Sequence, residues 1–268
     1  MNTSSPGRTP WRRAGTALLA AMLALTGCAR QTAAPAAAPD PRALVGMWTT
    51  HGTVVGITPG SLTVYQRCGS VSAAWRADTH GMFVGSLDGA GVGCYPLAPV
   101  PWLEKATAYR LDGDDAVLLD AGGGTLARLA PSSAAPRPDK ESFALTDEFL
   151  RSLDPAAALP ARLTPADRTK LLGRWTPVAP AASRPQQPYL ELRADGRWEG
   201  TDGCNGNRGG WVVGTDGTVL GTGGARTDVG CENVLIDTWM STARLAGFDG
   251  TTLVLLDQHA KELGRLHR

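Results

Sequence analysis

The side chains with the most distinctive chemistry in this sequence are its five cysteines: Cys28, Cys68, Cys94, Cys204 and Cys231. A cysteine sulfur can act as a nucleophilic thiolate, bind zinc or form a disulfide. Structural zinc sites usually bring two ligands within a few residues of each other, as in Cys-x-x-Cys, and the sequence contains no such pair. None of the four histidines clusters with a cysteine: His51, His80, His259 and His267. For the last four cysteines we therefore predict disulfides and no metal site. Free buried thiols are the alternative.

Carboxylates gather at Asp195, Glu199 and Asp202, close to Asn205 and Asn207. Such oxygen ligands suit a hard cation, and paired carboxylates can cleave glycosidic bonds. A calcium loop of the EF-hand type would need a further acid where this sequence has a valine. We interpret these residues as solvated turn residues. An enzyme that uses them on envelope polymers is the alternative.

Nucleophilic catalysis and phosphate binding have no candidate in the sequence. There is no Gly-x-Ser-x-Gly motif of the kind that positions a catalytic serine. The glycine run 121–124 lacks the lysine and the following helix that a phosphate-binding loop needs. We predict that the protein is not an enzyme, has no catalytic residues and uses no cofactor.

Cys28 stands at the end of an apparent export signal. Arginines precede a short apolar stretch, Ala14–Leu25, of about 12 residues, whereas a membrane span needs about 20. The sequence Leu25-Thr26-Gly27-Cys28 resembles the lipobox of bacterial lipoproteins. This resemblance implies a lipid thioether on Cys28 and cleavage just before it. An ordinary signal peptide with a chance cysteine is the alternative, and the pair Arg12-Arg13 leaves Sec and twin-arginine export both open.

These features predict a lipid-anchored protein on the extracytoplasmic face of the cell membrane. Two or more acyl chains anchor a protein stably where one does not. Disulfides persist outside the cytoplasm. The formal net charge of +1 gives no basic surface for nucleic acid, so the expected partners are the membrane, through the lipid on Cys28, and an envelope protein or ligand.

The same pattern occurs twice along the chain. Residues 44–48 (Leu-Val-Gly-Met-Trp) correspond to residues 171–175 (Leu-Leu-Gly-Arg-Trp), and residues 126–129 correspond to residues 263–266. Three pairs of tryptophans fall at matched positions: Trp48 and Trp175, Trp75 and Trp211, Trp102 and Trp239. We expect these tryptophans in the core. The alignment also matches Cys68 and Cys94 with Cys204 and Cys231, which predicts one disulfide within each copy, each closing a loop of about 25 residues and contributing roughly 3 kcal/mol.

Most of each copy shows strand patterns. Residues 189–193 alternate in polarity, and Asp195-Gly196 turns them into the next strand. Asp216-Gly217 marks another turn of this kind. Residues 253–256 and 263–266 are expected to form a closing hairpin.

We predict one clear helix, from Val234 to Leu245, with Leu235, Trp239 and Ala243 on one face and Gly247 after its end. Prolines in the equivalent stretch of the first copy predict a shorter helix that starts near Pro101. The sequence 164–167 (Thr-Pro-Ala-Asp) is typical of a capping box with proline at the first helical position, and Asp40-Pro41 is similar. Gly46 and Gly173 are expected to end each short turn and lead into a strand. Leu145 to Leu153 is expected to form a short amphipathic helical segment within the second linker.

Taken together, these elements predict a mainly β (α+β) fold of two tandem small antiparallel β domains, each with one short helix and one intradomain disulfide. The expected division is a signal peptide (1–27), a lipidated cysteine with a flexible tether (28–41), a first domain (42–130), an Ala/Pro-rich linker (131–163) and a second domain (164–268).

The second copy resembles the META domain family, which includes HslJ-like heat-shock proteins. The motif residues that carry the resemblance are Gly203, Cys204, Asn205, Thr227 and Cys231, after an opening tryptophan and before a helix and a closing hairpin. The first copy departs from this pattern, since Arg67-Cys68-Gly69 replaces Gly-Cys-Asn and Ala90 replaces the threonine. A tight turn beside a disulfide is the role that we expect for the motif.

We therefore expect a non-catalytic binding or structural role. A contribution to envelope stress tolerance is implied by the resemblance alone. The alternatives are a hydrolase of envelope polymers and a small-ligand carrier. The carrier requires a closed β-sheet that encloses an apolar cavity.

Overall fold

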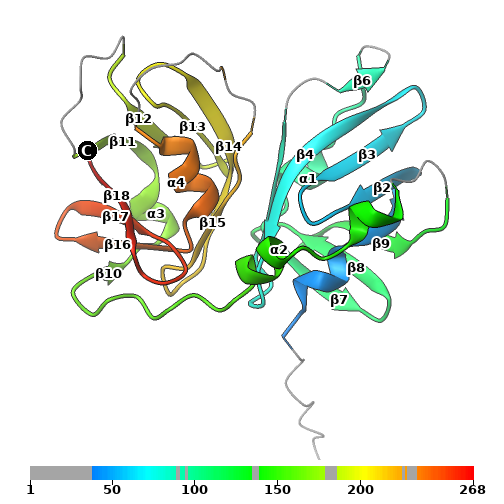
Figure 1. Ribbon diagram of the computed structural model, residues 1–268, viewed down its shortest axis with the longest axis horizontal. Helices are drawn as coiled ribbons and strands as arrows, with labels where there is room; N and C mark the ends of the chain where they lie inside the picture. Colours follow the sequence, from blue (N-terminus) through cyan, green and yellow to red (C-terminus); the bar gives the residue numbers. More distant parts are fainter. Residues whose placement is uncertain are drawn as a thin grey trace, which may run out of the picture. The chain divides into compact units, whose positions relative to one another are not determined.

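The computed structural model describes residues 38–88, 91–93, 96–134, 139–178, 186–224, 227 and 234–268. Contacts group Ala37–Arg268 into one compact unit, which is shown in Figure 1. Cys28 and most of the tether lie outside the described residues, so lipidation stays a prediction. Among the described residues, no helix is long and apolar enough to cross a membrane.

The chain folds mainly into antiparallel strands, as predicted. The first sheet contains β1 (Gly46–Thr50), β2 (Thr53–Ile57), β3 (Leu62–Gln66), β4 (Gly69–Ala77), β5 (Phe83–Leu87), β6 (Val92–Gly93), β7 (Ala108–Asp112), β8 (Asp115–Leu119) and β9 (Thr125–Pro131). The second contains β10 (Thr164–Pro165), β11 (Gly173–Pro177), β12 (Tyr189–Leu192), β13 (Arg197–Thr201), β14 (Gly206–Val213), β15 (Val219–Gly221), β16 (Leu245–Asp249), β17 (Thr252–Leu256) and β18 (Glu262–His267). The helical segments are η1 (Pro41–Leu44), α1 (Pro101–Glu104), η2 (Lys140–Phe143), α2 (Asp147–Ser152), α3 (Arg168–Leu171) and α4 (Ile236–Thr242).

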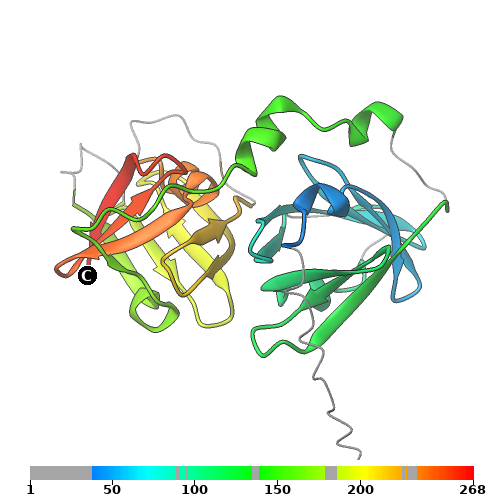
Figure 2. The same cartoon turned by 90° about the horizontal axis from the view of Figure 1, so that it is seen from below.

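The two sheets have the same strand order. The first runs β5-β4-β3-β2-β1-β9-β8-β7, and the second runs β15-β14-β13-β12-β11-β18-β17-β16, with β10 added beside β16. An isolated bridge between Met82 and Ala108 closes the first sheet on itself, and one between Thr218 and Leu245 closes the second. Each sheet therefore curls around its own apolar interior (Figures 1 and 2).

Matched positions in the two sheets also make matched hydrogen bonds. The indole nitrogen of Trp75 donates to the carbonyl oxygen of Thr58 at 2.9 Å, just after β2. Trp211 donates in the same way to Arg193, just after β12, at 3.2 Å. The first contact joins β4 to the end of β2, and the second joins the equivalent strand β14 to the end of β12. The repeat seen in the sequence is thus present in strand order and in hydrogen bonding.

The expected core tryptophans are buried, except that Trp239 is only partly so. Trp48, Trp75 and Trp102 belong to the apolar cluster inside the first sheet, and Trp175 and Trp211 to that inside the second. The predicted hairpins around Asp195-Gly196, around Asp216-Gly217 and between β17 and β18 are confirmed.

The helix predicted from Val234 to Leu245 is wrong at both ends. α4 covers only Ile236–Thr242, and its buried residues are Ile236 and Met240 rather than the predicted face. Leu235 caps the helix and is exposed. Ala243 already has extended backbone, because the chain there leaves the helix to pair as β16 with β17.

The predicted capping box at Thr164 is also wrong. Thr164 and Pro165 pair with β16, and the short helix α3 is capped instead by Asp167, whose carboxylate accepts the N–H of Lys170 at 2.9 Å. The equivalent prediction for the first copy is confirmed, since Asp40 caps η1 with Pro41 at its first position.

The connection between the sheets contains a short helix where Leu145–Leu153 predicted one. α2 places Phe149 against the first sheet, with its ring 5.8 Å from that of Trp75. Figure 2 shows η2, α2 and the extended chain after them passing from the first sheet to the second. The expected domain boundaries stay predictions.

Candidate ligand-binding pocket in the first sheet

The family motif of the second copy forms a hydrogen-bonded turn. The buried carboxylate of Asp202 accepts the backbone N–H groups of Cys204 at 2.8 Å and Asn205 at 2.6 Å. The amide oxygen of Asn205 accepts from the hydroxyl of Thr227 at 3.2 Å, and that hydroxyl accepts from the N–H of Gly206 at 3.2 Å. Asp202 thus fixes the motif and does not join the other acids.

The structure describes one cysteine of each predicted disulfide, Cys68 and Cys204, and the partners Cys94 and Cys231 lie outside the described residues. Neither Cys68 nor Cys204 is without a partner. Gly93, the residue before Cys94, pairs with Gly69, the residue after Cys68. The described backbone is therefore compatible with a bond between Cys68 and Cys94.

The other predicted acids lie in a polar cleft and are neutralised. Asp195 and Glu199 share the guanidinium of Arg193, at 4.0 and 3.5 Å. On the facing side, Glu104 pairs with Arg197 at 2.5 Å. The cleft has a volume of about 480 Å³. Each acid faces a cation, so none is left as an isolated acid or base.

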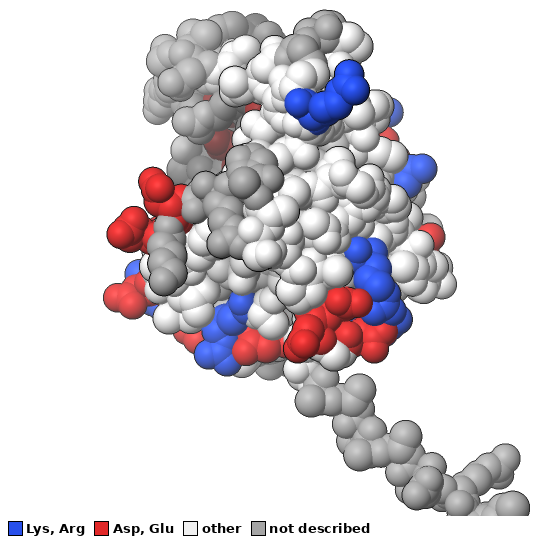
Figure 3. Space-filling view, turned by 90° about the vertical axis from the view of Figure 1, so that its right-hand side faces the viewer, with Lys and Arg blue, Asp and Glu red and all other residues white. Residues whose placement is uncertain are grey.

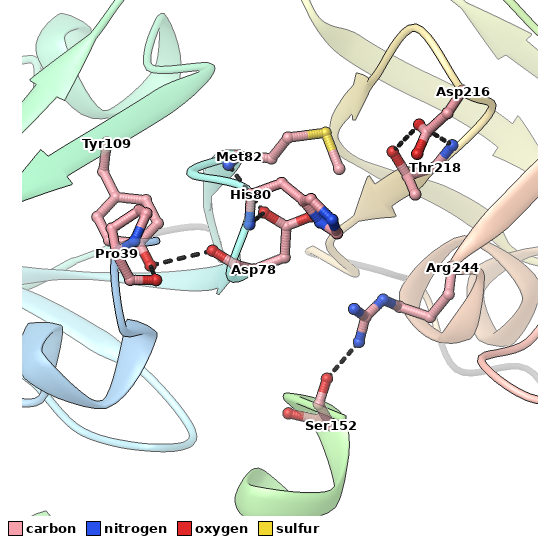
Figure 4. Close-up of polar contacts among 9 residues, drawn as sticks. All are labelled: Pro39, Asp78, His80, Met82, Tyr109, Ser152, Asp216, Thr218 and Arg244. Atoms are coloured by element: carbon pink, nitrogen blue, oxygen red, sulfur yellow. Dashed lines mark hydrogen bonds and ion pairs between the residues drawn. The ribbon is translucent and has the colours of Figure 1, made fainter. Parts of the chain in front are cut away.

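A second polar cluster is buried where the two sheets meet. Arg76, on β4, donates to the carbonyl oxygens of Gly221 at 3.1 Å and Ala243 at 3.2 Å. Arg244 donates to the carbonyl oxygen of Ser152, as Figure 4 shows. Burial and the neighbouring Arg244 guanidinium lower the pKa of Arg76, and the charge of Asp78 opposes that change.

Asp78 holds the loop between β4 and β5 in this cluster (Figure 4). It is only 2% exposed, and one carboxylate oxygen accepts the N–H groups of His80 at 3.0 Å and Met82 at 2.9 Å. The other oxygen lies 3.4 Å from Nδ1 of His80. Because the charged groups of this cluster bind backbone groups of the fold, the cluster connects the sheets and is a poor candidate for chemistry.

An apolar pocket opens at one end of the first sheet. We call it the Trp102 pocket. Its volume is about 770 Å³. Its walls come from the β1–β2 turn, β3, the β3–β4 turn, the segment before α1, α1 itself and β9. The apolar lining residues are Val64, Pro96, Leu97, Ala98, Pro99, Val100, Pro101, Trp102 and Leu126.

A proline-rich segment forms one wall of this pocket. Residues 96–101 read Pro-Leu-Ala-Pro-Val-Pro, and proline fixes the backbone φ angle. Gln66 on β3 holds this segment at its middle. Its side-chain amide donates to the carbonyl oxygen of Ala98 and accepts the N–H of Ala98, both at 2.7 Å. The wall is therefore fixed in place before any ligand binds.

His51 and Trp102 stack on each other and form an aromatic wall of the pocket. Their ring centroids lie 6.2 Å apart with an interplanar angle of 22°. His51 and Gly52 make the two-residue β1–β2 turn with φ angles of 49° and 72°. Such turns favour Asn or Gly, and a non-glycine residue in this region costs about 1 to 3 kcal/mol. Nε2 of His51 lies 3.0 Å from the carbonyl oxygen of Leu126, which can only accept, so Nε2 carries a proton.

The second sheet places its matching tryptophan differently. A Cβ on Gly264 would lie 2.6 Å from the ring of Trp239, so this indole packs directly against β18. The matching residue in β9 is Ala127, which has that Cβ. Trp102 instead lines the pocket beside His51.

Sequence reasoning missed this pocket. It treated His51 as an isolated histidine and the prolines near Pro101 only as a limit on helix length. The His-Gly pair between two strands was the available signal, because a histidine where Asn or Gly is usual indicates a constrained position. Comparisons with protein-family models, with curated proteins and with solved structures find no match to this chain.

Proposed function

We propose that this chain is a lipid-anchored protein of the bacterial cell envelope with a non-catalytic binding role, and that the Trp102 pocket binds a small, largely apolar ligand. The observation that carries the proposal is the pocket itself. Its volume of about 770 Å³ falls within the range of roughly 300 to 1,000 Å³ that small-molecule sites occupy.

The lining of the pocket supports a ligand rather than a packing defect. Val64 and Trp102 are 1% and 9% exposed and belong to the core of the first sheet, so the pocket reaches that core. Leu97 is partly buried and packs near Gly69 and Gly91. A preformed apolar wall of this kind lowers the ordering cost of binding.

The rest of the proposal rests on the sequence. The lipid on Cys28 and the tether after it would keep the described unit at the membrane. We further propose that the two sheets are tandem META-like domains, each with one intradomain disulfide, and their identical strand order supports this arrangement. A role in envelope stress tolerance rests on the family resemblance alone.

The hydrolase alternative has less support. Glu199 and Asp195 share one arginine, and Asp202 is occupied with the turn of the motif. The structure offers no observation that favours this alternative over binding.

The test is calorimetric titration of the full chain carrying Cys28→Ser, which has no lipid to compete with the probe. We expect 2-naphthamide, a neutral aromatic probe, to bind. Leu97→Gln puts a polar group on the apolar wall and should weaken binding about tenfold, or about 1.4 kcal/mol. Leu235→Gln is the matched control, since Leu235 is an exposed leucine that caps α4 and does not line the pocket.

A second variant keeps the test informative if Leu97→Gln fails to fold. Trp102→Phe keeps an aromatic ring but removes the indole, so 2-naphthamide should still bind while most of the ligand-induced change in tryptophan fluorescence disappears. Absence of probe binding to the parent chain would remove the proposal. So would binding that Leu97→Gln does not weaken together with a fluorescence change that persists in Trp102→Phe.

A further inference from the structure

We propose that the ligand of the Trp102 pocket is an amphipathic anion: an apolar, preferably aromatic body that carries one acidic group. This inference rests on the proposed function and specifies its ligand class. It follows from the charged side chains at the pocket and from the absence of acids among the lining residues that the structure describes.

Two cations line the pocket. Arg67 lies in the turn between β3 and β4, and Lys105 directly follows α1. Both are exposed. No aspartate or glutamate is among the described residues that line this pocket. The pocket therefore combines an apolar wall with a formal charge of +2.

Neither of these cations forms an ion pair within the described part of the chain. Elsewhere many exposed arginines are neutralised. Arg128 bonds Asp112 at 2.6 Å and Asp115 at 2.8 Å, and Arg265 bonds Asp249 at 2.8 Å. Figure 3 shows acidic and basic side chains next to each other along the lower edge of the face that it draws.

The aromatic wall specifies the body of the ligand. The stacked rings of His51 and Trp102 place aromatic side chains at the pocket, and aromatic rings prefer stacked or edge-to-face contacts with other rings. The cations Arg67 and Lys105 then attract an acidic group at the rim, where exposure to solvent keeps each ion pair weak. The apolar body of the ligand thus supplies most of the binding free energy, and its acidic group supplies the preference for an anion over a neutral or cationic ligand.

Three probes with the same ring system test this inference: 2-naphthoate, 2-naphthamide and 2-naphthylmethylammonium, which are anionic, neutral and cationic. Each is titrated into the full chain carrying Cys28→Ser. We expect the anion to bind about fivefold to tenfold more tightly than the amide and the cation to bind most weakly. The advantage of the anion should shrink as salt is added.

Charge reversal locates the effect. Arg67→Glu combined with Lys105→Glu should abolish the preference for the anion and favour the cation. The control is Arg162→Glu combined with Lys261→Glu, which changes the net charge equally at two exposed cations that do not line the pocket. This control should keep the preference for the anion.

The outcomes separate the two proposals. Equal binding of the three probes, with Leu97→Gln still weakening all of them, overturns the anionic ligand class and leaves the binding function intact. A preference for the anion that the control pair also abolishes reflects overall charge and likewise overturns the class. No binding by any probe removes both proposals.

A membrane lipid headgroup and a free small acid present similar chemistry, and one further arm distinguishes them. Vesicles of neutral phosphatidylcholine with and without anionic phosphatidylglycerol are added as competitors to 2-naphthoate. We expect no displacement, because the pocket encloses the apolar body of a small acid. Displacement by the anionic vesicles alone would overturn the free acid as the occupant.

Discussion

Trp48 donates its indole N–H to the carbonyl oxygen of Leu44, 2.8 Å away, and Trp175 donates to Leu171 at the same distance. The bond ties β1 to η1 in the first sheet and β11 to α3 in the second. A buried carbonyl left without its donor costs about 1 to 3 kcal/mol. The two bonds lie at equivalent positions in the two sheets, so the losses of stability on removing each bond can be compared directly.

Trp48→Phe and Trp175→Phe should each lower the free energy of unfolding by about 2 to 4 kcal/mol, from the lost hydrogen bond and the lost volume. Urea denaturation measures both. Trp102→Phe is the control, because its indole N–H has no hydrogen-bond partner among the described residues, and its loss should be smaller. A loss at Trp48 as small as that at Trp102 would show that the bond to Leu44 contributes nothing.

Each copy should contain one internal disulfide. Digestion of the native protein without reduction should yield peptides that link Cys68 to Cys94 and Cys204 to Cys231. Reduction should then lower the unfolding free energy by roughly 3 kcal/mol for each bond. Peptides that link Cys68 to Cys204 or Cys231 would contradict the matched repeats.

Asp202 and Glu199 should respond differently to neutralisation. Asp202 is 4% exposed and accepts two backbone N–H groups, so Asp202→Asn should cost about 3 kcal/mol of stability. Glu199 pairs with Arg193 at 3.5 Å on an exposed surface, and Glu199→Gln should cost less than about 1 kcal/mol. Thermal unfolding of both variants checks this difference.

A functional test of a variant with neutralised cleft acids addresses the hydrolase alternative. Complementation of a strain that lacks the gene by the Asp195→Asn, Glu199→Gln double variant should equal that by the wild-type chain. Failure of this well-folded double variant would return the acidic residues to consideration as functional groups.

The strands were predictable because their signals are local. Alternating polarity and Asp-Gly turns placed β12, β13 and the closing hairpin correctly. α4 was predicted too long because Ala243 fits a helical pattern, whereas the next residue, Arg244, is positioned by long-range contacts with Ser152 and β17. The Trp102 pocket was not predictable for the same reason, since its lining residues come from the β1–β2 turn, β3, the segment before α1 and β9, which meet only in the folded chain.

Tyr109 should make stability depend on alkaline pH. Its single O–H proton is shared between the carbonyl oxygens of Asp78 and Pro39, both 3.0 Å from the hydroxyl oxygen. Burial first, and the charges of Asp78 and Asp40 next, raise the pKa of Tyr109. The folded chain then keeps this proton at a pH where the unfolded chain has released it. Stability contributed by the neutral hydroxyl is therefore complete below about pH 10 and is lost as the pH rises beyond that value.

Tyr109→Phe distinguishes the effect of Tyr109 titration on stability from that of the other tyrosines. The variant should be less stable at pH 7 by about 1 to 2 kcal/mol, because two carbonyl oxygens lose their donor. Its stability should fall less steeply than that of the wild-type chain between pH 10 and pH 11. Parallel pH profiles for the two proteins would show that Tyr109 does not titrate differently on folding.

The contact between the two sheets can be tested at a single glycine. A Cβ on Gly210, in β14, would lie 2.7 Å from a methyl group of Val84 and 3.1 Å from the carbonyl oxygen of Gly85, both in β5. Gly210→Ala should therefore force β14 and β5 apart and cost about 1 to 3 kcal/mol. Gly206→Ala, on the same strand with nothing within 4 Å of the added Cβ, is the control and should be neutral or slightly stabilising.

Comparing the stabilities of Gly210→Ala and Gly206→Ala shows whether the two sheets stabilise each other. If β14 packs on β5 in solution, Gly210→Ala loses stability and the wild-type chain unfolds in one transition, because the buried apolar side chains Val84, Val212 and Leu220 join the sheets at this contact. If Gly210→Ala instead behaves like Gly206→Ala, the two sheets do not depend on each other. The binding pocket of the first sheet would then not need the second sheet for its stability.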